Sequence, residues 1–309
     1  MPYVFDHRPV LLSEVLTGLA IDPSGIYIDG TFGRGGHSRA ILEKLNEHGK
    51  LFAIDQDPEA EKEAHKIKNK NFYFIRESFK NIKKIADENN ITANIAGILL
   101  DLGVSSPQLD DATRGFSFQK DGPLDMRMDP DKGQSVAEFL ETVREEKLAE
   151  ILKTYGEERF AKKIARAIVT EQKEMPITNT LRLAEIIKKA NPAWERDKHP
   201  ATRAFQALRI YINQELEVLR TVLPHCLEIL KNNGRLAVVS FHSLEDRIVK
   251  QFIQEEIHGD VVLRQLPIKD RELKKSLRTM GRAIKPTEAE MKDNPRSRSA
   301  ILRIVEKLS

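Results

Sequence analysis

Cysteine, net charge and long apolar runs are scarce in this sequence, and each shortage excludes a class of protein. The single cysteine, Cys226, can form no internal disulfide, and its apolar, helical neighbourhood favours a core position over a nucleophile. No apolar run approaches membrane-spanning length, and residues 1–6 lack the basic and apolar regions of a secretory leader. The histidines are scattered without metal-ligand spacing, so we expect no metal site. These absences favour a cytoplasmic protein.

Charge is nearly balanced over the whole chain but not along it. The formal net charge of +3 does not by itself indicate a nucleic-acid partner. Between Arg264 and Arg303, however, twelve Lys or Arg residues stand against five Asp or Glu. Such a surplus suits contact with a phosphate backbone, although a solvated basic segment without a partner fits the composition equally well.

A glycine-rich turn follows the first predicted strand. The sequence Asp-Gly-Thr-Phe-Gly-Arg-Gly-Gly-His, residues 29–37, lies between the apolar run 26–28 and a helical stretch. A second apolar run, 51–54, ends in Asp55. A strand, a glycine turn, a helix and a second strand tipped by an acid form the first half of a nucleotide-binding sheet. Asp55 is then placed to accept both hydroxyls of a ribose.

The spacing of the glycines favours one nucleotide cofactor over another. A dinucleotide fingerprint that begins at Gly33 and Gly35 requires a third glycine where Ser38 stands. What remains is D-x-x-x-G-x-G, a pattern typical of S-adenosylmethionine enzymes, and it leaves Asp29 free to face the amino-acid end of the cofactor. A plain glycine turn is the alternative, and an acid at the position of Asp55 weakens it.

Apolar runs of strand length alternate with helical spacing over the first hundred residues and return near residue 235. This alternation predicts an α/β fold with a parallel, Rossmann-like sheet. Two late runs, 261–263 and 300–305, lack enough intervening helix for a crossover and predict an antiparallel edge pair. The remaining predicted strands are 26–28, 51–54, 72–75, 95–101 and 235–241, with helices over 38–48, 80–90 and 244–256.

The pattern between residues 135 and 223 is helical almost throughout. A chain of 309 residues exceeds the size of one efficient core, so two domains, or one domain with a large insertion, are expected. We predict an all-helical subdomain inserted into the sheet domain. The predicted boundaries are 1–110 and 216–309 for the two parts of the core, with the helical insertion at 111–215.

Ligands of an open α/β sheet bind beyond the carboxyl ends of its strands, so polar residues there are the site candidates. Phe79, at the third strand end, could stack on an adenine, although packing is the commoner role. His37 and His242 are candidates for catalysis, but capping of a helix start is favoured for both. The strand-end candidates are Asp29 with its glycines, Asp55, Phe79, Asp101 and residues 240–243.

The segment that follows the fourth strand begins with Asp101. In methyltransferases that act on exocyclic amines, this place usually holds an acidic or amide residue, two prolines and an aromatic. The amine lone pair of cytosine is delocalised into the ring, so hydrogen-bond acceptors on its protons restore nucleophilicity. Here only Pro107 appears, and Gln108 replaces the aromatic. Base stacking would move to Phe116 or Phe118, and a core position is an equal alternative for both.

Several blocks, read in order, are similar to one family. They are Asp29–Ser38, Leu99–Asp111, Arg114–Phe118, Asp121–Asp129, Tyr155–Ala161, His199–Arg203, Ser240–Arg247 and Asn294–Ser299. From His7 to the C-terminus the chain resembles the bacterial 16S ribosomal RNA cytosine-N4 methyltransferases, the MraW or RsmH family. The resemblance implies a Rossmann-like S-adenosylmethionine-dependent methyltransferase sheet with a helical insertion for substrate recognition. It also implies small-subunit ribosomal RNA or the 30S particle as partner, and one cytosine near the decoding centre as acceptor.

The resemblance also implies roles for single residues, but it leaves the acceptor of the amine proton open, with Asp101, Ser105 and Ser106 as candidates. A cysteine mechanism is not expected, because Cys226 is not at a strand end. Two other readings stay open: an NAD-dependent reductase, and an RNA chaperone on an inactive fold. The subunit count is left open, with a homodimer as one option. The residues implied to hold S-adenosylmethionine are Asp29, Gly33, Gly35, Gly36 and His37, then Asp55 and Phe79, and finally Asp101 and Gln108.

Overall fold

The computed structural model describes residues 9–193, 199–258 and 275–309. The chain forms two compact units. Unit 1 comprises Met1–Gly103 and Leu216–Ser309, and unit 2 comprises Val104–Glu215. The first predicted boundary, after residue 110, falls inside unit 2. Among the described residues, no helix combines the length and the apolar character needed to cross a membrane.

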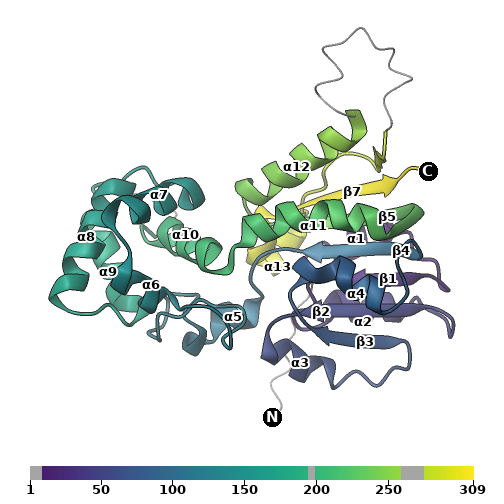
Figure 1. Cartoon of the computed structure of the whole chain (residues 1–309), viewed down its shortest axis with the longest axis horizontal. Helices are drawn as coiled ribbons and strands as arrows, with labels where there is room; N and C mark the ends of the chain where they lie inside the picture. The colour runs from purple at the N-terminus through teal and green to yellow at the C-terminus, as the bar shows by residue number, and fades with distance from the viewer. Residues whose placement is uncertain (1–8, 194–198, 259–274) are drawn as a thin grey trace, which may run out of the picture. The chain divides into compact units, whose positions relative to one another are not determined.

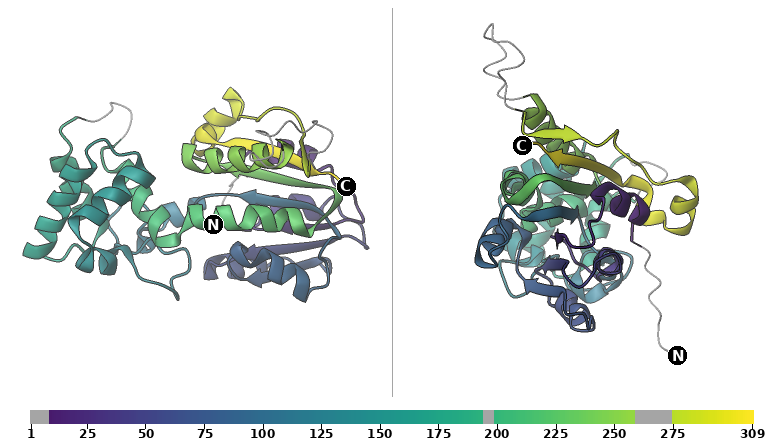
Figure 2. Two further views of the ribbon diagram at one scale, coloured as in Figure 1. Left: turned by 45° about the horizontal axis from the view of Figure 1, so that its top comes forward. Right: turned by 90° about the vertical axis from the view of Figure 1, so that its right-hand side faces the viewer.

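Unit 1 is built on a seven-stranded sheet with the order β3-β2-β1-β4-β5-β7-β6 (Figure 1). The first five strands in this order are parallel, while β7 runs antiparallel to both β5 and β6. Figure 2 shows β7, in yellow, alongside β5. The predicted α/β class with a Rossmann-like sheet is confirmed. The strands are β1 (Ile26–Asp29), β2 (Lys50–Asp55), β3 (Phe72–Arg76), β4 (Ile95–Asp101), β5 (Leu230–Ser240), β6 (Leu277–Thr279) and β7 (Ile301–Lys307).

The strand order reverses at β1, which lies between β2 and β4. In register, Asp29 of β1 is opposite Ala53 of β2 and Leu99 of β4. The carboxyl ends of β1, β2 and β4 therefore meet at one edge of the sheet, at the switch point where such folds bind ligands. Three of the predicted acids, Asp29, Asp55 and Asp101, end these three strands.

Helices cover both faces of this sheet, and that explains why β4 is apolar along almost its whole length. Figure 1 shows α4 (Ile82–Glu88) and α11 (Glu215–Ile229) on the near face, with α1 (Leu12–Leu19) and α2 (Gly36–Leu42) behind. Val15 of α1 and Ile41 of α2 join Leu51 and Leu99 in one buried cluster. The remaining helices of unit 1 are α3 (Pro58–Ala64), α12 (Ser243–His258) and α13 (Glu288–Asp293).

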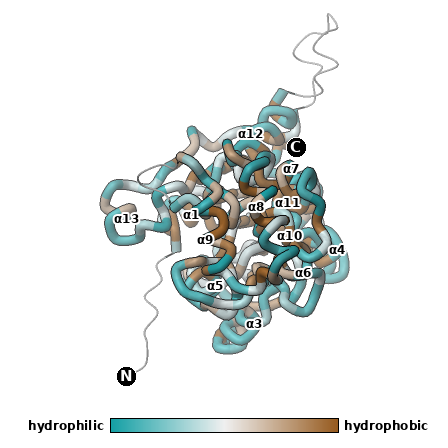
Figure 3. The backbone as a smooth tube through the Cα atoms, turned by 90° about the vertical axis from the view of Figure 1, so that its left-hand side faces the viewer, coloured by the Kyte–Doolittle hydropathy of each residue, from teal (hydrophilic) through white to brown (hydrophobic). Residues whose placement is uncertain are grey.

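Unit 2 is helical, as predicted for the insertion. Apolar and polar stretches alternate along its helices, and the apolar ones form a core of their own (Figure 3). Phe116 is buried in this core, and Phe118 packs on Phe205 and His199. Phe116 is thus a core residue, whereas Phe118 is partly buried against this core, and its base-stacking role stays a prediction. The helices are α5 (Ser106–Asp110), α6 (Val136–Thr142), α7 (Glu145–Gly156), α8 (Ala161–Glu174), α9 (Thr180–Ala190) and α10 (Thr202–Asn213).

Two details differ from the sequence-based prediction. The helix predicted over 38–48 begins at Gly36 and ends at Leu42, because the backbone turns there and the N–H of Asn46 bonds the carbonyl of Pro23. The antiparallel neighbour of β7 at the sheet edge is β6, whose three residues are too few to give a strand pattern. The run 261–263, predicted for that place, lies outside the described residues.

Candidate functional site

The turn after β1 is fastened to both neighbouring strands. The N–H of Gly30 bonds the carbonyl of Leu99 in β4 at 2.9 Å, and the N–H of Phe32 bonds Ile54 in β2 at 3.0 Å. A Cβ on Gly30 would lie 2.6 Å from the side chain of Leu100. The absence of a side chain therefore lets the turn lie directly over the strand ends.

The side chain of Asp29 is hydrogen-bonded within this turn. Its carboxyl group accepts hydrogen bonds from the N–H of Thr31 at 3.1 Å and from the hydroxyl of Ser38 at 2.6 Å. The residue is only 1% exposed, and burial raises the pKa of its carboxyl. The expectation that Asp29 is free to face the cofactor does not fit this geometry, since the carboxyl organises the turn instead.

The predicted glycines of the turn have conformations that side chains disfavour. Gly33 and Gly35 have positive φ angles of 56° and 76°. A Cβ on Gly35 would lie 2.6 Å from the ring of Phe32, and one on Gly36 would lie 2.4 Å from Pro9. These contacts show that a side chain on Gly35 or Gly36 would collide with Phe32 or Pro9, so the turn can pack closely only with glycine at these positions.

Asp55 ends β2 and is half-buried beside the turn. One carboxyl oxygen accepts from the N–H of Gly33 at 2.7 Å, and the other accepts from the N–H of Asp57 at 2.9 Å. Burial is the main cause that raises its pKa to about 6, against two backbone hydrogen bonds that lower it. Each oxygen keeps a further lone pair, so the carboxylate can still accept from the two hydroxyls of a ribose.

Phe79 stands beside the same turn. It begins a short 3-10 helix, Phe79–Asn81, which the hydroxyl of Ser78 caps. The Cβ of Phe79 lies 3.5 Å from the position that a Cβ on Gly30 would take. A half-buried ring in this place can flank a flat ligand bound over the turn.

Asp101 ends β4, and its carboxyl group differs from that of Asp29 in its hydrogen bonding. Its N–H donates to the hydroxyl of Thr31 at 2.6 Å, but its Oδ1 atom is buried without a hydrogen-bond partner among the described residues. Burial first, then the charges of Asp29 and Glu245, raise the pKa of this carboxyl well above its usual range. A buried polar atom without a partner is unfavourable, and it indicates a place for a ligand.

His37 and His242 were both predicted to cap helices, and only His242 does. Its Nδ1 lies 3.4 Å from the N–H of Glu245, in the first turn of α12. His37 instead places Nε2 at 3.1 Å from the carbonyl oxygen of Val10 and Nδ1 at 3.6 Å from Oδ2 of Asp101. The ring of His37 is therefore part of the strand-end site.

Three residues that help to build this site were missed: Thr31, Ser38 and Glu245. Glu245 is 2% exposed and accepts from the N–H groups of Phe241 at 2.8 Å and His242 at 3.3 Å. An acid in the first turn after a strand end is a signal of a capping box, which could have predicted Glu245. Thr31 and Ser38 carry no comparable capping signal: Thr31 contacts Asp101, 70 positions away, and Ser38 bonds Asp29 across the turn.

Ser105, Ser106 and Gln108 lie at the start of α5 in unit 2. Ser105 accepts from the N–H of Gln108 at 3.4 Å, and the Gln108 side chain accepts from the N–H of Ser105 at 2.8 Å. This capping box follows from the spacing S-x-x-Q, which the sequence analysis did not use. Ser106 and Gln108 are buried. The catalytic and cofactor roles of these three residues remain predictions.

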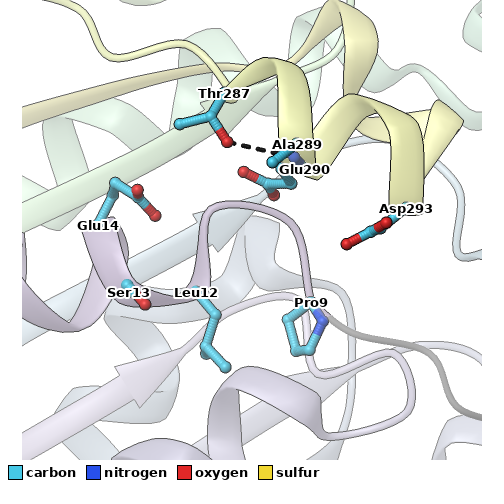
Figure 4. Close-up of a pocket in the computed structure, with 8 residues that line it drawn as sticks. All are labelled: Pro9, Leu12, Ser13, Glu14, Thr287, Ala289, Glu290 and Asp293. Carbon is cyan, nitrogen blue, oxygen red and sulfur yellow. Dashed lines mark hydrogen bonds between the residues drawn. The ribbon is translucent and has the colours of Figure 1, made fainter.

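A pocket of about 230 Å³ lies elsewhere in unit 1, between the start of α1 and α13 (Figure 4). Its lining includes the carboxylates of Glu14, Glu290 and Asp293 and contains none of the strand-end acids. Pro9 belongs both to this lining and to the contact with Gly36. We therefore assign the nucleotide site to the strand ends and not to this pocket.

Comparisons with known proteins identify the family of the chain. The chain is 54% identical over 305 residues to the ribosomal RNA small subunit methyltransferase H of Coxiella burnetii, strain RSA 331, with 98% of this chain and 99% of that protein covered. The protein of strain CbuG_Q212 has the same identity and coverage. A solved rRNA methylase from Streptococcus thermophilus is 12% identical with a TM-score of 0.42, over 99% of this chain and 100% of that chain, a likeness too weak to support any argument. The model of the MraW methylase family matches residues 4–308, and the chain belongs to this family.

Proposed function

We propose that this protein transfers a methyl group from S-adenosylmethionine to the exocyclic N4 amine of a single cytosine, position 1402, in 16S ribosomal RNA. Membership of the methylase family and the names of its close relatives support the reaction type and the ribosomal RNA. The observation that carries the proposal is Oδ1 of Asp101, a buried acceptor at the switch point of the sheet for which the described residues provide no hydrogen-bond partner.

The residues at the strand ends fit the cofactor, which supplies an activated methyl group on a positively charged sulfur. Asp55 would accept from the ribose hydroxyls, and Phe79 would flank the adenine. Gly33, Gly35 and Gly36 would lie beside the methionine part. Asp29 contributes by holding the turn in shape through Thr31 and Ser38. His37, Asp101 and Gln108 complete the predicted set of contacts.

The target amine needs an acceptor for its proton, because its lone pair is otherwise delocalised into the cytosine ring. Asp101 is the acceptor that the geometry favours, since its Oδ1 has no hydrogen-bond partner among the described residues, while His37 faces the other oxygen, Oδ2. Ser105 and Ser106 are the other candidates. The hydroxyl of Ser105 already accepts a backbone hydrogen bond in its capping box, so it is less suited to the role.

Reaction at a base edge requires that the cytosine leave its stack and enter a pocket. Unit 2, as the predicted substrate-recognition part, and the exposed Arg296 and Arg298 of unit 1 would contact the RNA. The protein positions two reactants and needs neither a covalent intermediate nor a metal ion for the displacement.

A methyl-transfer assay tests this function. Purified protein, S-adenosylmethionine with a labelled methyl group, and either free small-subunit RNA or 30S particles would be combined, and the product nucleoside identified by mass spectrometry. We expect N4-methylcytidine at one position. Label at another atom, or no label on either substrate, would refute the proposed function.

A further inference from the structure

The ring of His37 lies between two oxygen atoms. The carbonyl oxygen of Val10, 3.1 Å from Nε2, can only accept, so Nε2 carries a hydrogen. Nδ1 faces Oδ2 of Asp101 at 3.6 Å, which is longer than a hydrogen bond but within ion-pair range. With His37 neutral and Asp101 ionised, the lone pair of Nδ1 would face a carboxylate oxygen. One proton shared by the two side chains removes this repulsion.

The partner of Nε2 is held in place from the C-terminal part of the chain. The N–H next to Val10, that of Leu11, donates to Oε1 of Glu290 in α13 at 2.7 Å. Figure 4 shows Pro9 and Glu290 on opposite walls of the pocket between α1 and α13. Because Pro9 also packs on Gly36, the segment 9–11 fixes the orientation of the His37 ring.

Carboxylates from two other elements lie near Asp101. Asp29 of β1 and Glu245 of α12 both disfavour its ionisation, and its own burial does so more strongly. The neighbouring basic groups are His37, beside Asp101, and His242, whose Nε2 lies 3.2 Å from Glu245. Such a cluster is balanced by a bound proton or by a cation placed among the carboxylates.

We propose that His37 and Asp101 together hold one proton in the ligand-free protein, and that they release it when a cationic sulfonium ligand binds beside them. The inference rests on the proposed function, because that function places S-adenosylmethionine at these strand ends. The demethylated product, S-adenosylhomocysteine, has the same adenosine and amino-acid parts but an uncharged sulfur. The pair therefore keeps its proton when the product is bound.

This proton balance fits the transfer step. The amine lone pair forms the nitrogen–carbon bond, the carbon–sulfur bond breaks with its electrons on sulfur, and the amine loses a proton. The site loses a positive charge at the same moment, so Asp101 accepts the amine proton on Oδ1 and His37 shares it. The proton leaves to solvent when the next donor replaces the product. His37 is a positioning residue in this scheme, since it acts through Asp101.

Calorimetry can count the protons. The wild-type protein would be titrated with S-adenosylmethionine and with S-adenosylhomocysteine in buffers of different ionisation enthalpy at several pH values. We expect the sulfonium ligand to release about one proton more than the product, and the ratio of the two affinities to rise up to about tenfold per pH unit in its favour. Asp55 does not affect this ratio, because both ligands carry the same ribose.

The variant His37→Gln keeps an amide donor for Val10 and removes the titrating ring. We expect it to lose the difference in proton release between the two ligands. His48→Gln is the matched control, because the side chain of His48 is 75% exposed and pairs only at the surface with Glu47. Asp101→Asn is a second variant that should also abolish the difference, in case His37→Gln does not fold.

The possible failures are distinguishable. Equal proton release by the two ligands in the wild-type protein, or an unchanged difference in folded His37→Gln, would overturn the inference alone. A wild-type protein that binds neither ligand would overturn the proposed function and this inference with it.

Discussion

Two aspartates end neighbouring strands of one sheet, but the surroundings of their carboxyl groups differ. Asp29 at the end of β1 accepts from Thr31 and Ser38 and is only 1% exposed, so its carboxyl is enclosed by the turn that it supports. Asp101 at the end of β4 has an oxygen without a partner in the described part of the chain. Burial raises the pKa of both carboxyls. We infer that the first aspartate stabilises the turn and that the second serves the ligand.

This difference shows that a strand-end acid is an ambiguous sign of chemistry. Both aspartates follow an apolar run, and both were predicted to face the ligand. Hydrogen bonds across the turn distinguish the two aspartates. Ser38 donates to the carboxyl of Asp29, whereas the hydroxyl of Thr31 accepts from the backbone N–H of Asp101. We therefore expect a substitution of Asp101 to lower catalytic activity, and the loss of a hydrogen bond to Asp29 to lower stability.

The largest effect is expected on catalysis from Asp101→Asn. Replacing the acceptor by an amide should lower kcat for methyl transfer by about 10²–10⁴-fold, the usual contribution of a positioned proton acceptor. Single-turnover methyl transfer at saturating cofactor would measure this. Asp131→Asn, at an exposed position in unit 2, is the control. A kcat within a few-fold of wild type would return the role to Ser105 or Ser106.

Asp55→Ala should weaken the binding of S-adenosylmethionine by about 1–3 kcal/mol, because ribose hydroxyls would lose a charged acceptor. Calorimetry would measure the affinity of the variant and of the wild type. The pKa of Asp55 is raised to about 6, so the ionised acceptor is present above that pH and lost below it. Wild-type affinity for the uncharged product should therefore fall as the pH drops through 6, and Asp55→Ala should abolish this dependence. Unchanged affinity in the variant would contradict the role.

The same raised pKa has a consequence for folding. Between its usual pKa of 3.8 and about 6, the Asp55 carboxyl binds a proton in the folded chain but not in the unfolded chain. This group's contribution to stability is therefore present at low pH and is lost as the pH rises through 6.

Ser38→Ala should affect stability more than chemistry. It leaves one oxygen of buried Asp29 without its donor, and we expect the free energy of unfolding to fall by about 1–3 kcal/mol. Urea denaturation would measure the change, with the exposed Ser13→Ala as control. If Ser38→Ala abolishes kcat in a protein of wild-type stability, the assignment of Asp29 to the turn is wrong.

The smallest effect is expected from Arg296→Ala combined with Arg298→Ala. Both side chains are exposed on the short helix Pro295–Ser299, while Ser297 between them is buried and donates to the carbonyl of Asn294 at 2.7 Å. Two lost phosphate contacts should lower the salt-dependence slope of RNA binding by about 1.4. Filter binding over a salt series would show this, with the exposed Arg220→Ala and Lys250→Ala as the control pair. An unaltered slope would leave the segment as a solvated basic surface.

Much of the fold could be predicted from sequence because its signals are local. Apolar runs ended by acids identified β1, β2 and β4, and the glycine spacing identified the turn. The edge strand β6 could not be predicted, because three residues, Leu277–Thr279, acquire strand geometry only by pairing with β7. Helix ends were predicted less well than helices, as for α2, which stops at Leu42.

The site was predicted as a set of strand ends but not as a network. The sequence indicates that His37 lies in the turn. Its contact with Val10, however, spans 27 positions, and its contact with Asp101 spans 64. No periodic or capping signal encodes such distances. The buried position of Glu245 could have been inferred from its place after His242, since an acid there bonds the free N–H groups at a helix start.

The most direct test of the central claim is a crystal structure of the protein with S-adenosylhomocysteine. We predict the ribose hydroxyls within hydrogen-bond distance of the Asp55 carboxylate, the adenine beside Phe79, and the sulfur over the turn near Asp101. A ligand bound in the pocket between α1 and α13, or anywhere else away from the ends of β1, β2 and β4, would contradict the account.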